Sequence, residues 1–203
     1  SRRCRIVRNG KHVVVDPLSG VETVQIPEVG ELECFYTDGL STLPDTFKDV
    51  PFMEEKTLRY PGHAAKMKTL SELGFFSDKP VTVSGSNVVP RKVAAALLAS
   101  KLKAETMLDI VILLVYVSGT KDRRSLRYEF NLIDSFDEES GITAMGRTTG
   151  YTASIVGQMI GGGMIEDAGV LPPEGIGLNP QLYGRFREEL AKRSIKPELK
   201  VAS

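Results

Sequence analysis

The sequence predicts an α/β fold of the α+β kind, with strands and helices both distributed along the 203 residues. Residues 30–37 and 126–134 alternate polar and apolar side chains, which is typical of strands with one buried face. Residues 64–73 and 151–160 instead repeat apolar side chains at helical spacing, and each segment is followed by glycine. No G-x-G-x-x-G pattern follows a predicted strand, so this sequence lacks the dinucleotide-binding fingerprint.

The composition argues against several classes of protein. Acidic and basic residues balance at 26 each without a basic stripe, so we expect no nucleic-acid partner. The most apolar run, 110–117, is too short to cross a bilayer, so we expect no membrane partner. The two cysteines, Cys4 and Cys34, and the two histidines, His12 and His63, have neither disulfide nor metal-ligand spacing, which predicts no metal site. A soluble, cytoplasmic protein is the expectation.

The first third of the chain is predicted to be mainly β. Residues 3–15 are expected to form a hairpin, because Asn9-Gly10 accepts the positive φ angles of a tight type I′ turn. Further elements are predicted at 21–26 (a short strand), 30–37 (a strand with one buried face) and 40–47 (a short helix capped by Ser41 or Thr42).

Residues 55–76 are the segment around which the prediction is organised. A strand over 56–60 meets Pro61-Gly62, and a helix over 64–73 follows, with Gly74 as its C-terminal cap. The polar side chains of this corner are Thr57, Arg59, Tyr60 and His63. Free N–H groups at a helix N-terminus attract anions, and an arginine adds a planar fork suited to a carboxylate. The alternative is a surface ion pair beside a partly buried tyrosine.

The middle of the chain predicts a helix followed by two strands. Val81–Val83 belongs to a short apolar segment, 81–84, and Ser86-Asn87 before Pro90 signals the start of a helix over 93–104. The apolar run 110–117 favours a strand that is covered on both faces. The polar link 120–125 would join it to 126–134 as a hairpin, although two unrelated strands remain the alternative.

The last third is predicted to be helical. A helix over 151–160 ends at Gly161–Gly163, a loop over 170–180 follows, and Asn179-Pro180 begins a final helix that ends near 193. The tail from 196 is expected to be frayed. Arg147 and Thr148 precede the first of these helices and suggest a second anion-binding corner, unless Thr148 or Thr149 is a plain helix cap.

Four motifs, in this order and spacing, resemble the substrate-binding part of saccharopine dehydrogenase-like enzymes. They are T-L-R-Y-P-G-H at 57–63, L-x-x-L-G-F-F at 70–76, M-G-R-T-T-G-Y-T at 145–152 and G-V-L-P-P-E at 169–174. Within that family the sequence is most similar to L-lysine dehydrogenases of bacteria and archaea. Members begin with a Rossmann domain that binds NAD(P) and continue into a mixed-sheet domain, flanked by helices, that holds the substrate and builds a homodimer.

The resemblance implies a domain organisation. This sequence is expected to begin inside the second domain, with the Rossmann domain absent from it. Residues 1–142 would form the mixed-sheet substrate-binding and dimerisation part, and 143–203 a helical segment that completes the same domain. NAD or NADP would be bound mainly by the absent domain.

The resemblance also implies roles for the corner residues. In saccharopine reductases the matching T-I-R-Y segment contacts the substrate, so Arg59 should bind the α-carboxylate of an amino acid, with hydrogen bonds from Thr57 and Tyr60. His63 is the candidate catalytic, proton-transferring residue, and Arg147 and Thr148 are further candidates for substrate binding. Saccharopine reductases carry another arginine after a Tyr-Pro, whereas this chain has no base over 36–39. A substrate with one carboxylate and an ammonium end fits this difference.

The expected function is therefore NAD(P)-dependent oxidative deamination of L-lysine by the protein to which this chain belongs. Two alternatives remain. The chain could belong to a saccharopine or carboxynorspermidine dehydrogenase or reductase, or it could be a non-catalytic dimerisation or ligand-sensing module.

Overall fold

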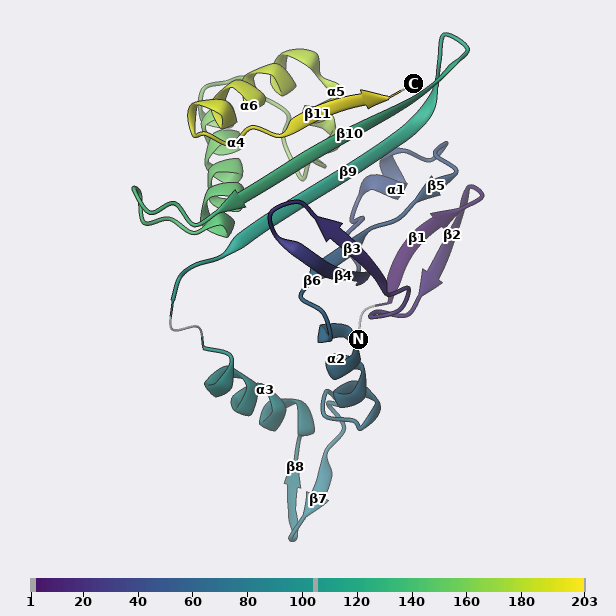
Figure 1. Cartoon of the computed structure of the whole chain (residues 1–203), viewed down its shortest axis with the longest axis vertical. Coiled ribbons are helices and arrows are strands. Elements are labelled where there is room, and N and C mark those ends of the chain that lie inside the picture. The colour runs from purple at the N-terminus through teal and green to yellow at the C-terminus, as the bar shows by residue number, and fades with distance from the viewer. Residues whose placement is uncertain (1–2, 104–105, 203) are drawn as a thin grey trace. The chain divides into compact units, whose positions relative to one another are not determined.

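The computed structural model describes residues 3–103 and 106–202, and the chain divides into two compact units, 1–104 and 105–203. The α+β class is confirmed, because both units contain strands and helices (Figure 1). Where the resemblance implied a mixed sheet, the strands of the described residues form four small sheets in which neighbours run antiparallel. The expected boundary between 142 and 143 lies inside the second unit.

The first unit opens with the predicted hairpin. Strand β1 (Cys4–Arg8) pairs with β2 (Lys11–Val15), and its other edge pairs with the short β5 (Phe52–Met53). The turn residues Asn9 and Gly10 have φ angles of 50° and 70°, as a type I′ turn requires.

A second three-stranded sheet carries the corner. Residues 32–36 of its central strand are all buried, so the prediction of a single buried face is wrong. The reason is that both faces are covered: the His63 ring stacks on Phe35, while Tyr36 packs with Cys4 of the first sheet. The strands, in spatial order, are β3 (Glu22–Ile26), β4 (Gly30–Tyr36) and β6 (Lys56–Arg59).

The helix after the corner ends as predicted. Gly74 has a φ angle of 81°, its N–H donates to the Ser71 carbonyl, and the Phe75 N–H donates to the Leu70 carbonyl, which together make a Schellman cap. The helices of this unit are α1 (Leu43–Thr46), α2 (His63–Glu72) and α3 (Pro90–Lys101).

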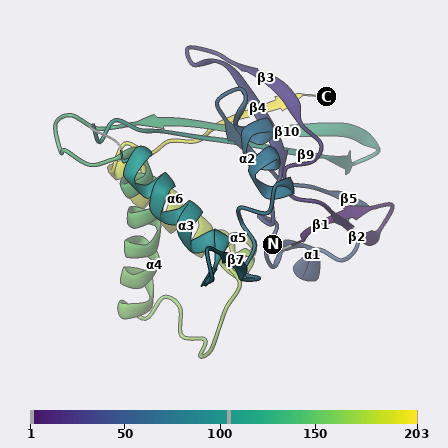
Figure 2. The ribbon, with the colours of Figure 1, turned by 90° about the horizontal axis from the view of Figure 1, so that it is seen from below.

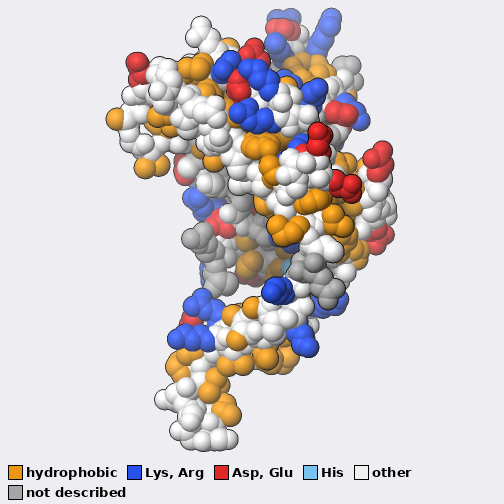
Figure 3. Space-filling model, turned by 90° about the vertical axis from the view of Figure 1, so that its left-hand side faces the viewer, with side chains coloured by type: hydrophobic (Ala, Val, Ile, Leu, Met, Phe, Trp, Pro, Cys, Tyr) orange, Lys and Arg blue, Asp and Glu red, His pale blue; other side chains and the backbone are white. Residues whose placement is uncertain are grey.

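The expected helix start at Ser86-Asn87 is wrong. Those residues lie in a hairpin of β7 (Val81–Val83) and β8 (Ser86–Val88), and α3 begins afterwards, at Pro90. Hydrophobic side chains are exposed on this hairpin, at the lower end of the view in Figure 3. Residue 104, where the helix was predicted to end, lies outside the described residues.

The second unit is built on a long hairpin of β9 (Ile110–Lys121) and β10 (Arg124–Ser135), which confirms the predicted pairing. The prediction that β9 is covered on both faces is wrong: Leu113 and Val117 are 49% and 52% exposed, because β9 is an edge strand of the sheet. The tail is not frayed either. It forms β11 (Glu198–Ala202), which pairs with β10.

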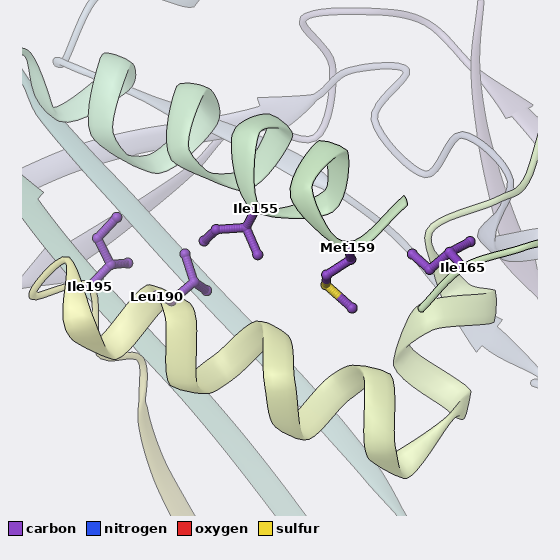
Figure 4. Packing of buried hydrophobic residues seen from close by; sticks show 5 residues of the cluster. All are labelled: Ile155, Met159, Ile165, Leu190 and Ile195. Carbon is purple, nitrogen blue, oxygen red and sulfur yellow. The ribbon is translucent and has the colours of Figure 1, made fainter. Parts of the chain in front are cut away.

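Helices pack on this sheet, with α4 on one side of it in the nearly edge-on view of Figure 2. A buried cluster of Ile155, Met159, Ile165, Leu190 and Ile195 joins α4 to α6 (Figure 4). As predicted, the Asn179 side chain caps α6. The helical elements are a π-helical turn η1 (Gly146–Gly150), α4 (Tyr151–Gly161), α5 (Glu174–Leu178) and α6 (Pro180–Lys192). No helix of the described residues is long and apolar enough to span a membrane.

Candidate functional site

The pairing of β4 with β6 decides which side chains of the corner share a face. Glu33 lies opposite Arg59, and Phe35 lies opposite Thr57. Because opposite residues in a sheet point to the same side and alternate residues repeat that side, these four share one face. Beyond the paired residues, Thr37 and Glu55 continue it, since their side chains are hydrogen-bonded. We call residues 33, 35, 37, 55, 57 and 59 the odd-numbered face.

Glu33 caps helix α2 from the neighbouring strand. Its two carboxylate oxygens accept hydrogen bonds from the backbone N–H groups of Gly62 at 2.9 Å and Ala64 at 2.6 Å. The N-cap residue itself, Gly62, has no side chain to do this. The pKa of Glu33 is lowered, chiefly by the hydrogen bond from the Ala64 N–H. The Gly62 N–H and the His63 charge lower it further, whereas burial opposes them by favouring the neutral carboxyl group.

This cap changes the predicted anion site. The N–H groups of Gly62 and Ala64 donate to Glu33, and the His63 N–H donates to the Tyr60 carbonyl at 3.4 Å. The expectation that the helix N-terminus offers free N–H groups to a bound anion is therefore wrong for these three groups, because a carboxylate and a carbonyl of the chain itself accept their hydrogen bonds.

Arg59 remains open to a ligand. Its side chain is exposed, and one guanidinium nitrogen donates to the Leu58 carbonyl at 2.8 Å. Among the residues that the structure describes, the Arg59 guanidinium forms no ion pair with an acidic side chain. Tyr60 follows the last residue of β6 and is 67% exposed. The surface ion pair that was the alternative for Arg59 is thus not formed within the described chain.

His63 and Thr57 lie on the same face as Arg59 but differ in their contacts. The His63 ring stacks on Phe35, with centroids 5.8 Å apart and ring planes 6° from parallel. The Thr57 hydroxyl donates to Glu55 at 3.1 Å and contacts the Thr37 hydroxyl at 2.6 Å. The structure therefore gathers three of the predicted site residues, Thr57, Arg59 and His63, on one face.

The predicted second corner belongs to the other unit, and its arginine is engaged internally. The buried Arg147 guanidinium contacts Asp134 and Asp137, each at 3.0 Å, and also donates to the Arg193 carbonyl at 3.4 Å. Thr148 does not cap a helix: its hydroxyl donates to the Ala144 carbonyl one turn earlier, and Thr149 donates to the Met145 sulfur. We assign Arg147 to the stability of its unit and keep the proposed carboxylate site at Arg59.

Comparison with known proteins identifies the family. The sequence profile of the saccharopine dehydrogenase C-terminal domain matches residues 1–195. The chain belongs to this family.

A solved structure shows the same fold. Apo histidine-tagged saccharopine dehydrogenase (L-Glu forming) from Saccharomyces cerevisiae is similar, with a TM-score of 0.75 and 17% sequence identity. The alignment covers 99% of this chain and 59% of the yeast chain. This chain therefore spans less than two thirds of its structural relative, and the likeness concerns the fold.

Two acidic residues that shape the site could not be recognised from the sequence. Glu33 caps a helix whose N-cap residue, Gly62, lies 29 residues later, and Glu55 joins the loop over 37–39 to β6. Capping patterns that can be recognised in a sequence lie within about four residues of the helix start, so they cannot reveal a partner from another strand.

Proposed function

We propose that this chain is the substrate-binding part of an NAD(P)-dependent amino-acid dehydrogenase, and that its substrate is L-lysine or a close relative. The observation that carries the proposal is the exposed Arg59 guanidinium, which has no acidic partner among the described residues and shares a face with Thr57 and His63. Its planar fork fits a carboxylate in a bidentate manner. Membership of the family supports an amino acid as the molecule that supplies that carboxylate.

In this proposal the chain orients the substrate rather than breaking bonds. Arg59 fixes the α-carboxylate, which positions the amine-bearing carbon for hydride loss and reduces the entropy cost of reaction. Tyr60 donates a hydrogen bond to the substrate, and Thr57, whose own hydroxyl proton is directed to Glu55, accepts one from the substrate amine. In this proposal His63, whose ring stacks on Phe35, exchanges a proton with the amine, because histidine is the side chain that most often transfers protons in catalysis.

The residues of this corner do not fit the nicotinamide cofactor itself. A pyrophosphate binds at a helix N-terminus with free N–H groups, and two of those at the start of α2, on Gly62 and Ala64, already donate to Glu33. We therefore propose that NAD or NADP is bound mainly by another part of the protein, where it would accept the hydride. No cluster of three or more His, Cys, Asp or Glu residues in 3–103 and 106–202 is arranged to hold a metal ion.

We further propose that the protein works as a cytoplasmic homodimer. Cys4 and Cys34 are both free and buried, which suits a reducing compartment. The edge strand β9 leaves apolar side chains exposed, and a second copy of the chain could cover them.

The test is turnover by the full-length protein with NAD or NADP and either L-lysine or saccharopine. Lysine-dependent reduction of the cofactor supports the proposal. Activity with saccharopine alone would instead support the alternative function, that of a saccharopine dehydrogenase, which is the name of the yeast relative. Replacing Arg59 by alanine is expected to raise the Kd for lysine about ten- to hundred-fold, because charge-assisted hydrogen bonds contribute about 1.5–3 kcal/mol.

A matched control is Arg91→Ala, which removes another exposed arginine, one that is paired with Asp78 at 2.7 Å. This control should leave lysine affinity unchanged. If the Arg59→Ala and Arg91→Ala proteins bind lysine equally well, Arg59 is not the carboxylate site.

A further inference from the structure

Glu55 is held on the odd-numbered face by neutral donors. Its carboxylate accepts hydrogen bonds from the Thr37 hydroxyl at 2.7 Å, the Thr57 hydroxyl at 3.1 Å and the Gly39 N–H at 3.1 Å. The two hydroxyl oxygens also lie 2.6 Å from each other. Thr37 and Thr57 have one hydroxyl proton each, whereas three short contacts join their oxygens to each other and to Glu55. One of these contacts therefore lacks a proton, so this cluster of oxygens can accept a further hydrogen bond.

The loop over 37–39 is shaped around this carboxylate. A Cβ atom at Gly39 would lie 2.5 Å from Glu55 Cδ and 2.6 Å from its Oε2. Only glycine leaves room for the carboxylate in this position, and the Gly39 N–H then reaches it as a donor. The position of the Glu55 side chain is thus fixed from two sides, by the loop and by Thr57.

Two nearby carboxylates, Glu54 and Glu22, have cationic partners, whereas Glu55 has none within the described residues. Glu54 pairs with Arg8 at 2.6 Å, and Glu22 pairs with Lys56 at 2.6 Å. A half-buried carboxylate with neutral donors alone is less well compensated than one that also meets a cation. An ammonium group bound here would supply both a positive charge and hydrogen-bond donors to the carboxylate.

Glu55 and Arg59 stand at two ends of one short segment. They lie four residues apart around β6, which places their Cα atoms about 13 Å from each other at a rise of about 3.3 Å per residue. Thr57 lies between them on the same face. Arg59, Thr57 and Glu55 therefore follow one another on one face, with a cationic and an anionic side chain at the two ends.

We propose that Glu55 binds the distal ammonium group of the substrate and so selects a diamino acid, with Thr37, Thr57 and Gly39 holding the carboxylate in place. This inference rests on the proposed function, because it assumes that Arg59 binds the α-carboxylate. It adds a residue that decides specificity at the other end of the same substrate.

The competing explanation is purely structural: Glu55 would only tie the loop over 37–39 to β6. The two explanations predict different effects of a Glu55 substitution on the affinities for two ligands, one with and one without a distal ammonium group. Loss of a structural tie weakens binding of any ligand at this face, whereas loss of an ammonium partner weakens binding of lysine and spares 2-aminohexanoate, which has the same carbon chain without the distal amine.

The experiment is calorimetric titration of the full-length protein, with NAD(P)H present, using L-lysine and L-2-aminohexanoate. Glu55→Gln should weaken lysine binding about ten- to hundred-fold and change 2-aminohexanoate binding less than about two-fold, as expected for loss of a charge-assisted contact. Gly39→Ala, which displaces the carboxylate without changing the charge of the chain, should act in the same direction. It keeps the test informative if Glu55→Gln does not fold.

Glu54→Gln is the matched control, because it removes the same charge from the adjacent residue, which is already paired with Arg8. It should leave the ratio of the two affinities unchanged. A Glu55→Gln protein that loses affinity for both ligands equally, or for neither, overturns the inference while Arg59→Ala still reports on the carboxylate site. A wild-type protein that binds neither ligand overturns the proposed function as well.

Discussion

Replacing Glu33 by glutamine is the sharpest test of how the corner is held together. The substitution keeps the size of the side chain and removes its charge. In the folded chain both carboxylate oxygens accept backbone hydrogen bonds, from Gly62 at 2.9 Å and Ala64 at 2.6 Å. The glutamine amide has one acceptor oxygen, so its NH₂ group must face one of these two donors.

The expected cost follows from these two bonds. Loss of a helix N-cap destabilises by about 0.5–2 kcal/mol, and a buried donor left unpaired costs about 1–3 kcal/mol. We therefore expect the Glu33→Gln change to lower the free energy of unfolding by about 2–3 kcal/mol. For a unit of this size that corresponds to a fall in Tm of roughly 8–20 °C.

The pH dependence gives an independent check on the charge. The pKa of Glu33 is lowered in the fold, chiefly by the Ala64 N–H and against the effect of burial, so its stabilising contribution is complete above the pKa of the unfolded chain. That contribution is lost as pH falls from about 4.5 through the folded-state pKa. The difference in stability between wild type and Glu33→Gln should be full at pH 7 and shrink below about pH 4.5.

Urea unfolding at several pH values, together with hydrogen exchange of the amides at 62–64, measures both effects. Glu31→Gln is the control, because Glu31 is exposed on the same strand and bonds only the Gln25 side chain among the described residues, so a change within about 0.5 kcal/mol is expected. Equal stability of the two variants at pH 7, or a difference that ignores pH, would refute the capping role.

Three further substitutions test other parts of the fold. Arg147→Ala should lower the free energy of unfolding in urea by about 3 kcal/mol, because it leaves the Asp134 carboxylate buried without its cationic partner. Lysine affinity should be unchanged. Weaker lysine binding at full stability would show that Arg147 belongs to the substrate site. Asn179→Ala should cost about 1 kcal/mol in the same assay through loss of the α6 cap, and Asn179→Asp should cost less. Gly20→Ala should lower the Tm through a loss of about 2–3 kcal/mol, because φ is +61° and the new Cβ would lie 2.4 Å from Tyr36 Cε2; an unchanged Tm would show that Tyr36 moves freely.

Features that depend on a few adjacent residues were predicted well. The hairpin at Asn9-Gly10, the Gly74 end of α2 and the Asn179 cap of α6 are all present. Each of these signals acts over four or five residues, so the sequence contains all the groups that interact.

Features that depend on a distant partner were missed or misjudged. The tail forms β11 because β10 offers it a free edge, and nothing within residues 196–202 indicates that partner. The apolar run of β9 predicted two covered faces, but an edge strand is partly exposed whatever its composition. Burial is a property of the neighbours rather than of the segment itself.

The site divides in the same way. Thr57, Arg59 and His63 were predicted together because they lie within seven residues at a turn from strand to helix, and the structure places them on one face. The contacts that define their chemistry come from β4 and the loop that follows it. Glu33 accepts hydrogen bonds at the helix N-terminus, so the proposed anion site is the Arg59 guanidinium alone, while Glu55 is positioned by Thr37 and Gly39.

By itself, then, the sequence determined the local turns and caps, the family and the arginine for which a carboxylate ligand is proposed. The tertiary structure alone decided which N–H groups are already satisfied, which arginine is buried with aspartates, and which carboxylate of this corner has no cationic partner among the described residues. The physical reason is that hydrogen bonds and ion pairs act over about 3–4 Å in space, and antiparallel pairing brings residues that lie 20 to 30 positions apart in the sequence within that distance.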